Sequence, residues 1–196
     1  HIPELNGLGD KITIGHVIHH TSGIRGRAGL MQLFGWKFHN GITNEDVLKV
    51  TSRQKELNFL PGDRHQYLST NYILLAEIIE RTTGESFVNW TQENIFKPLK
   101  MNNSFFRTDS SRLIKNRAEG YESSEKGIYI KADSMSSEYG NGNLHTTVGD
   151  MIKWSNSLLE QSLAPKAVYE QILKTGKLNS GKDSFYAFGL IKRPLP

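Results

Sequence analysis

The sequence contains no cysteine. This absence excludes a disulfide framework, a cysteine nucleophile and a thiolate metal site within the 196 residues. Long apolar runs are missing as well, because the longest, Tyr72–Ala76, is far too short to cross a bilayer. No signal-peptide pattern is visible, an observation that carries no information on compartment for a truncated chain.

Clustered charge is also scarce. The net charge is +4 and the isoelectric point about 9.2, but the lysines and arginines are scattered along the chain rather than grouped. That spread argues against a nucleic-acid-binding surface. The length fits one domain, and an apolar content of 37% with 18 glycines suits a soluble globular chain rich in loops.

The most informative stretch that is present is Pro61–Phe106. It opens with a proline-glycine turn signal and continues into a stripe of apolar residues at helical spacing. Ser69 or Thr70 is the expected N-cap, and Gly84 is a fitting end, where a left-handed residue is needed. This pattern predicts a long amphipathic helix.

Capping residues elsewhere in the sequence predict further elements. Capping residues mark helix starts at Thr13, Thr43, Ser86 and Thr147. Residues 1–12 are expected to be an extended lead-in with turns at Pro3 and at Gly7–Gly9. Strands are expected at 127–130 and, because polar and apolar residues alternate, at 184–192.

Three blocks together carry a family resemblance. They are Ile12–Ile24 (ITIGHVIHHTSGI), Pro61–Phe106 with its PG turn, tyrosine, helix and IFKPLKM ending, and Gly140–Trp154 (GNGNLHTTVGDMIKW). In sequence, order and spacing these blocks resemble the serine β-lactamase and penicillin-binding-protein-like family, in particular its branch related to class C β-lactamases. The resemblance runs from about His1 to Leu190.

The resemblance implies an α+β fold of the β-lactamase/transpeptidase type. In that fold a mostly helical region packs against an antiparallel sheet. Residues 1–196 are therefore expected to be a partial domain, with the helical region at about 13–160 and one candidate sheet strand at 184–192. Most of the central sheet is expected to lie outside this chain.

Two motifs of the family's active site are missing. Family members carry a nucleophilic serine in Ser-x-x-Lys upstream of the HTSG block, and Lys-Thr-Gly or His-x-Gly on a late strand. Ser52–Lys55 matches the first motif by letter, but it ends a helix instead of starting one. Lys174–Gly176 matches the second, but its place after a helix is more typical of a C-cap. We interpret the chain as an internal fragment.

Tyr67 is the strongest candidate for catalysis. In the family, the tyrosine of Tyr-x-Asn points into the active site from the helical region and helps to move a proton between nucleophile and leaving group. A free tyrosine has a pKa of about 10 and is a poor base alone, but a nearby lysine cation stabilises a phenolate. The alternative is a buried tyrosine with a bonded hydroxyl beside a helix start.

Ser69 stands where the family has asparagine. That asparagine donates its amide to the acyl side chain of the substrate, so Ser69 is the candidate substrate-binding residue. A serine is shorter and offers a single hydroxyl donor. The change is expected to weaken recognition of penicillin-like amides and to leave ester hydrolysis possible, unless Ser69 is only a helix cap.

The histidines near the N-terminus invite a metal-binding interpretation, because His16 and His20 would share one face of a helix. No glutamate stands beside His16, where a zinc protease has its base, and no third ligand is evident. We therefore expect structural histidines and neither a metal nor an organic cofactor. In the family, the HTSG block (His20–Gly23) is a turn and packing element.

The resemblance implies a serine hydrolase that acts through an acyl-enzyme, as a β-lactamase, a D-alanyl-D-alanine carboxypeptidase or an esterase. Its partner is then a β-lactam, a D-alanyl peptide or an ester, with no nucleic acid and no membrane segment in this chain. The fragment alone is expected to be inactive. The alternative is a non-catalytic relative that binds peptides or cell-wall ligands. A bacterial envelope or secreted location follows from the resemblance only.

Overall fold

The computed structural model describes residues 1–36, 41–124, 127–132 and 136–192. Its elements follow in chain order: the 3-10 helix η1 (Pro3–Lys11), α1 (Ile14–Ile18), α2 (Arg27–Leu33), α3 (Asn44–Thr51), α4 (Ser69–Thr83), α5 (Phe87–Thr91), the π-helical turn η2 (Gln92–Phe96), β1 (Phe105–Phe106), β2 (Tyr121–Ser123), β3 (Tyr129–Lys131), β4 (Leu144–His145), α6 (Val148–Glu160) and α7 (Lys166–Ile172).

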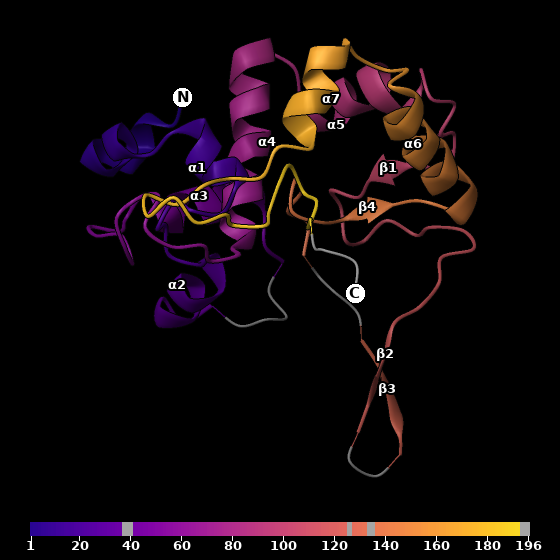
Figure 1. Ribbon diagram of the computed structural model, residues 1–196. Coiled ribbons are helices and arrows are strands. Elements are labelled where there is room, and N and C mark those ends of the chain that lie inside the picture. Colours follow the sequence, from indigo (N-terminus) through magenta and orange to yellow (C-terminus); the bar gives the residue numbers. More distant parts are fainter. Residues whose placement is uncertain (37–40, 125–126, 133–135, 193–196) are drawn as a thin grey trace.

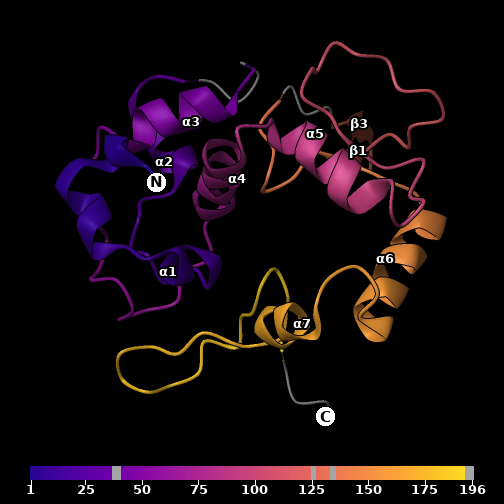
Figure 2. The same cartoon turned by 90° about the horizontal axis from the view of Figure 1, so that it is seen from above.

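Helix α4 lies at the centre of the arrangement (Figure 1). Its residues Ile73, Leu74 and Ala76 are each 1% exposed. The helix contacts α1 and α3 on one side and α5 on the other, and Figure 2 shows these neighbours around it. The predicted long amphipathic helix therefore forms, and it is the element against which both sides of the molecule pack.

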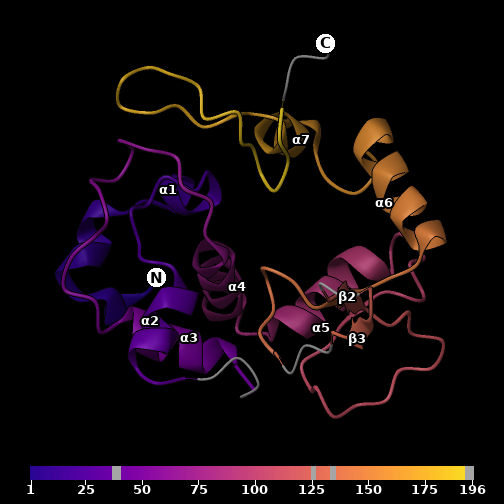
Figure 3. The ribbon, with the colours of Figure 1, turned by 90° about the horizontal axis from the view of Figure 1, so that it is seen from below.

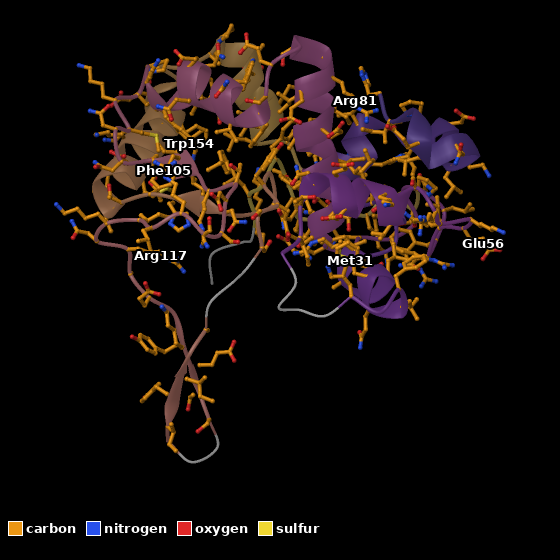
Figure 4. All side chains as sticks on the ribbon, turned by 180° about the vertical axis from the view of Figure 1, so that it is seen from behind. Met31, Glu56, Arg81, Phe105, Arg117 and Trp154 are labelled. Carbon is orange, nitrogen blue, oxygen red and sulfur yellow. The ribbon has the colours of Figure 1, made fainter. Side chains whose placement is uncertain are left out.

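Two apolar clusters hold α4 to the N-terminal elements. One joins α2, α3 and α4 through Leu30, Met31, Ile42, Val47, Val50 and Ile73. The other joins η1, α1 and α4 through Leu5, Val17, Ile24 and Leu74. Figure 4 shows Met31 on this side of the molecule, with Trp154 and Phe105 on the opposite side. The start of α4, where Tyr67 lies, is thereby fixed against the N-terminal elements.

Four of the predicted N-caps are confirmed. The side chains of Thr13, Thr43, Ser86 and Thr147 each accept a hydrogen bond from the backbone N–H three residues later. Gly84 ends α4 with a φ of 75°, a conformation that glycine adopts without steric cost. Local capping chemistry thus fixes most of the helix starts that the sequence indicated.

Strands are few and short in the part of the chain that the structure describes. β1 pairs with β4, and β2 pairs with β3, each pair antiparallel. The β2–β3 hairpin projects away from the helical body (Figure 1), and Tyr129 and Ile130 on it are exposed. The strand expected at 127–130 corresponds to β3. Small antiparallel sheets beside many helices fit the expected α+β class.

Two expectations about elements are wrong. Residues 3–11 form a 3-10 helix rather than an extended lead-in, since Pro3 fits a first helical turn and Leu5 is buried. Residues 184–192 form no strand. The backbone turns at Phe185 (φ 57°) and Gly189 (φ 74°), which leaves one isolated antiparallel bridge between Tyr186 and Ile191.

Among the described residues, no helix combines the length and the apolar character needed to cross a membrane.

Candidate active site

Tyr67 lies immediately before α4, whose N-cap is Leu68. Its side chain is 58% exposed. The ring centroid lies 4.4 Å from that of His20 and 6.2 Å from that of Tyr186. The phenol ring therefore lies beside the buried rings of His20 and Tyr186, and more than half of the side chain is exposed to solvent. A proton-transfer role requires such exposure. The role itself stays a prediction.

Five rings form an aromatic cluster around this point: His20, His65, Tyr67, Tyr72 and Tyr186. His20 is at its centre, with its ring centroid 5.1 Å from that of Tyr72 and 4.6 Å from that of Tyr186. His20 comes from the turn after α1, His65 and Tyr67 from the segment before α4, Tyr72 from α4 itself, and Tyr186 from the segment after α7. Segments far apart in the sequence thus meet at Tyr67.

The segment after α7 is held against the N-terminal elements, and Figure 3 shows it running past α1. The backbone carbonyl of Tyr186 lies 3.0 Å from His19 Nδ1, and the Asn179 amide donates to the Pro61 carbonyl at 3.0 Å. Gly176 permits this approach, because a Cβ there would lie 2.6 Å from the side chain of His19. The close packing places Tyr186 in the cluster.

A cavity of about 280 Å³ adjoins the cluster. It is lined by His65, Ser184, Phe185, Tyr186 and Ile191. Two of these residues, His65 and Tyr186, belong to the aromatic cluster, and the Tyr186 ring lies 6.2 Å from that of Tyr67 between centroids. Its lining combines polar side chains, such as Ser184, with apolar ones, such as Ile191.

Two other hollows lie away from Tyr67. A cavity of about 400 Å³ lies among η1, α1 and α4 and is lined largely by apolar residues such as Ile2 and Leu74. An apolar groove of about 230 Å³ lies among α4, α5 and α6, with Trp90 and Trp154 in its walls. The larger volume of the first does not make it the active site, since neither hollow contains a member of the aromatic cluster.

Burial shifts the acid–base chemistry of the cluster. It lowers the pKa of His20 to about 4, with smaller contributions from His65 and His19, so His20 is neutral at pH 7. Burial also lowers the pKa of His65 and raises that of Tyr186. The pKa of Tyr72 is raised, first by burial and then by Tyr186, and its hydroxyl donates to the Ile18 carbonyl at 3.3 Å. These groups stay uncharged at neutral pH.

Ser69 is the first residue of α4 and is half-buried. The N-cap is Leu68, which makes no side-chain capping bond. The Thr70 hydroxyl is used elsewhere, because it accepts from the backbone N–H of Arg27 at 2.9 Å. The capping interpretation of Ser69 and Thr70 is therefore wrong, and the substrate-binding role of Ser69 stays a prediction.

The two motifs that match by letter have local structural roles. Ser52 is the C-cap of α3 and donates its hydroxyl to the Lys49 carbonyl at 3.0 Å, as its place at a helix end predicted. Lys174–Gly176 is not the expected cap, since α7 ends at Ile172 with Leu173 as its C-cap. Gly176 instead allows the close approach of His19.

The N-terminal histidines do not share a helix face, since α1 ends at Ile18 and His20 has a φ of 55°. His16 caps α1, with its Nδ1 accepting from the Thr13 N–H at 3.2 Å. No group of three or more histidine, aspartate or glutamate side chains placed to hold a metal ion occurs among the described residues.

His65, Tyr72 and Tyr186 are site residues that the sequence did not reveal. His65 stands where the family pattern has an aromatic residue, which was the available signal. Nothing in the sequence of the segment after α7 indicates that it returns to α1, because that contact depends on tertiary packing around Gly176.

Comparison with known families gives a match over nearly the whole chain. The family model described as Beta-lactamase matches residues 1–191. The D-aminopeptidase of Gluconobacter oxydans is 26% identical over 175 residues, which are 89% of this chain and 33% of that protein. Penicillin-binding protein 4* of Bacillus subtilis is 26% identical over 201 residues, 94% of this chain and 44% of that protein. The chain thus spans between a third and a half of the length of these relatives.

Solved structures that resemble this chain include a penicillin-binding protein homologue and an amidohydrolase. The octameric penicillin-binding protein homologue from Pyrococcus abyssi aligns with a TM-score of 0.74 at 26% identity, over 92% of this chain and 43% of that one. A D-stereospecific amidohydrolase from Streptomyces aligns with a TM-score of 0.77 at 22% identity, over 96% and 61%. The second likeness concerns the fold alone.

Proposed function

Because this chain belongs to the β-lactamase family, we propose that it supplies the helical part of a serine hydrolase that acts through an acyl-enzyme. The nucleophilic serine and its lysine are placed outside residues 1–196. The observation that carries the proposal is the exposed Tyr67 phenol just before α4, which belongs to the matched Pro61–Phe106 block. Its ring lies 6.2 Å, between centroids, from that of Tyr186, one of the residues that line the cavity of about 280 Å³.

In the proposed reaction, the serine oxygen attacks a carbonyl carbon and passes its proton to the lysine–tyrosine pair. Backbone N–H groups hold the oxyanion of the tetrahedral intermediate. The carbon–nitrogen or carbon–oxygen bond then breaks, and the leaving group takes the proton by way of Tyr67. Water adds to the acyl-enzyme by the same route in reverse, which releases the acid and restores the serine.

The names of the relatives favour one substrate class, an amide or peptide bond next to a D-configured residue. A D-aminopeptidase and a D-stereospecific amidohydrolase are among the proteins similar to this chain. The penicillin-binding relatives keep D-alanyl peptides and β-lactams as candidates. Ser69, with one hydroxyl in place of an amide, is expected to weaken recognition of penicillin-like amides and to leave ester hydrolysis possible.

The test uses the intact protein that contains these residues. We expect a fluorophosphonate to label one serine outside residues 1–196, and D-alanine p-nitroanilide to be hydrolysed faster than its L-enantiomer. Residues 1–196 alone should show neither reaction. Labelling of a serine within this chain, such as Ser52, would contradict the placement of the nucleophile. A protein that is neither labelled nor active would support the non-catalytic, ligand-binding alternative.

A further inference from the structure

The position of Tyr67 depends on one buried histidine. His20 is 0% exposed and contacts the residues on both sides of Tyr67. Its carbonyl accepts from the Gln66 N–H at 2.9 Å, and its Nδ1 accepts from the Leu68 N–H at 3.3 Å. Its ring lies against the Tyr67 ring at 4.4 Å between centroids. The main chain and the side chain of His20 thus hold the residues immediately before and after Tyr67.

The orientation of the His20 ring is itself fixed by hydrogen bonds. The Ser22 hydroxyl donates to Asn71 Oδ1 at 2.8 Å, so the amide turns its Nδ2 toward His20 Nδ1, 3.0 Å away. Ser22 Oγ in turn accepts from the Ile24 N–H at 3.3 Å. The Leu68 N–H and the Asn71 amide both point at Nδ1, so this nitrogen carries a lone pair. The ring proton is therefore assigned to Nε2, which is buried and has no hydrogen-bond partner among the described residues.

The backbone turn that presents the ring is specific. His20 has a φ of 55°, in the left-handed region, and Gly23 has a φ of 73°. A Cβ at Gly23 would lie 2.1 Å from the Phe59 carbonyl oxygen, so only glycine fits there. The turn also accepts hydrogen bonds from Gly62 and Asn58, at 2.8 and 2.7 Å. The His20–Gly23 turn is therefore a rigid support and not a mobile loop.

We propose that His20 is a positioning residue that holds residues 66–68 through its carbonyl and its Nδ1, and thereby aims the Tyr67 phenol at the reacting atoms. This inference rests on the proposed function for its catalytic consequence. The histidine touches no substrate in this scheme and acts through Tyr67. The role fits histidine because a neutral imidazole accepts at one nitrogen and fills the space between Tyr67, Tyr72 and Tyr186.

Three substitutions of His20 distinguish the effect of the Nδ1 hydrogen-bond acceptor from the effect of the side-chain volume. His20→Ala removes the Nδ1 acceptor. His20→Asn restores an acceptor oxygen near the Nδ1 position and tolerates the left-handed backbone. His20→Gln keeps more bulk, but its oxygen lies one bond farther out, near the Nε2 position. His16→Ala is the matched control, since His16 belongs to the same segment and caps α1 without contact to residues 66–68 in the described structure.

The first readout is the environment of the Tyr67 ring, measured as a fluorine chemical shift. With 3-fluorotyrosine at position 67 of the intact protein, the fluorine resonance should lie away from its denatured-state shift. His20→Asn loses the imidazole ring current but keeps an acceptor, so its resonance is the reference for the other two variants. His20→Ala and His20→Gln should move the resonance farther toward the denatured-state shift than His20→Asn does, while His16→Ala should leave it unchanged. If the alanine variant does not fold, the glutamine variant decides. A resonance that a folded alanine or glutamine variant moves no farther than His20→Asn does would overturn the proposal, whatever the activity.

The second readout is a double-mutant cycle on kcat for D-alanine p-nitroanilide. With Tyr67 present, His20→Ala should lower kcat at least tenfold with little change in KM, and His20→Asn should stay within about threefold of the parent. In a Tyr67→Phe background, His20→Ala should have less than a twofold further effect. Equal losses in both backgrounds would overturn action through Tyr67. If Tyr67→Phe alone leaves kcat unchanged, the proposed catalytic role fails, and the fluorine resonance decides the positioning role by itself.

Discussion

Ser69 occupies the first position of α4, two residues after the exposed phenol of Tyr67. Because its hydroxyl does not cap the helix, the side chain is free of the local role that commonly explains a serine at a helix start. The sequence showed that a serine stands at position 69, where the family pattern has an asparagine. It did not reveal that Leu68 takes the N-cap position, because the N–H of Arg27 occupies the Thr70 hydroxyl only in the folded chain.

Replacing Ser69 by asparagine should raise the preference of the intact protein for amide over ester substrates. An asparagine amide offers donors and an acceptor to an acyl side chain, where the serine hydroxyl offers one donor. We expect the ratio of kcat/KM for an N-acylated D-alanyl amide, whose acyl side chain carries an amide group, to that for a simple acetate ester, which lacks one, to rise about tenfold, the worth of one hydrogen bond. Ser69→Ala is the control and should not raise it. An unchanged ratio in the asparagine variant would refute a substrate-binding role.

At the scale of elements, local chemistry explains most of what the sequence predicted. Thr13, Thr43 and Thr147 begin helices because each hydroxyl accepts from a free backbone N–H. The prediction failed at 184–192, where alternation suggested a strand. Left-handed turns at Phe185 and Gly189, which depend on packing against the N-terminal elements, bend the backbone instead.

Helix α6 gives a direct test of the capping argument. Thr147 Oγ1 accepts from the Asp150 N–H at 3.3 Å, and Thr147→Ala removes this bond. We expect the free energy of unfolding to fall by about 1 kcal/mol. Ser155→Ala, at an exposed position inside the same helix, should cause little change or a slight gain. Urea titrations of both variants provide the measurement, and an equal loss in the two would contradict the assigned cap.

At the scale of the whole molecule, histidines with lowered pKa values link stability to pH. Burial holds the pKa of His20 at about 4, against an ordinary value of about 6.5. Burial also lowers the pKa values of His16, His65 and His145. Between pH 6.5 and 4 the unfolded chain binds protons at these positions that the folded chain does not bind, so stability rises with pH across that window and is lost as the pH falls.

The intact protein should therefore be less stable at pH 4.5 than at pH 7, by roughly 2 kcal/mol from His20 alone, since each unit of pKa difference is worth about 1.4 kcal/mol. His20→Asn, which has no proton to gain, should show a smaller loss over the same range. Paired carboxylates such as Glu4 and Asp150 have lowered pKa values and contribute mainly below this window. Stability that is unchanged or higher at pH 4.5 would contradict the buried, neutral state of His20.

The whole-molecule arrangement was the part least accessible from sequence. The family blocks indicated that Tyr67 lies at a helix start in a β-lactamase-like fold. Its meeting with His20 and Tyr186 requires three distant segments to pack together, and no local pattern in the sequence specifies such a meeting.

The central claim is that the Tyr67 phenol moves a proton in acyl transfer. Its most direct test is kcat for D-alanine p-nitroanilide in the intact protein carrying Tyr67→Phe, which keeps the ring and removes the hydroxyl. Tyr121→Phe is the matched control, because Tyr121 is 61% exposed, close to the 58% of Tyr67, but lies on the projecting hairpin. We predict that Tyr67→Phe lowers kcat by about 10²- to 10⁴-fold, the usual worth of general acid–base catalysis, and that Tyr121→Phe leaves it unchanged. A kcat for Tyr67→Phe within twofold of the parent would contradict the claim.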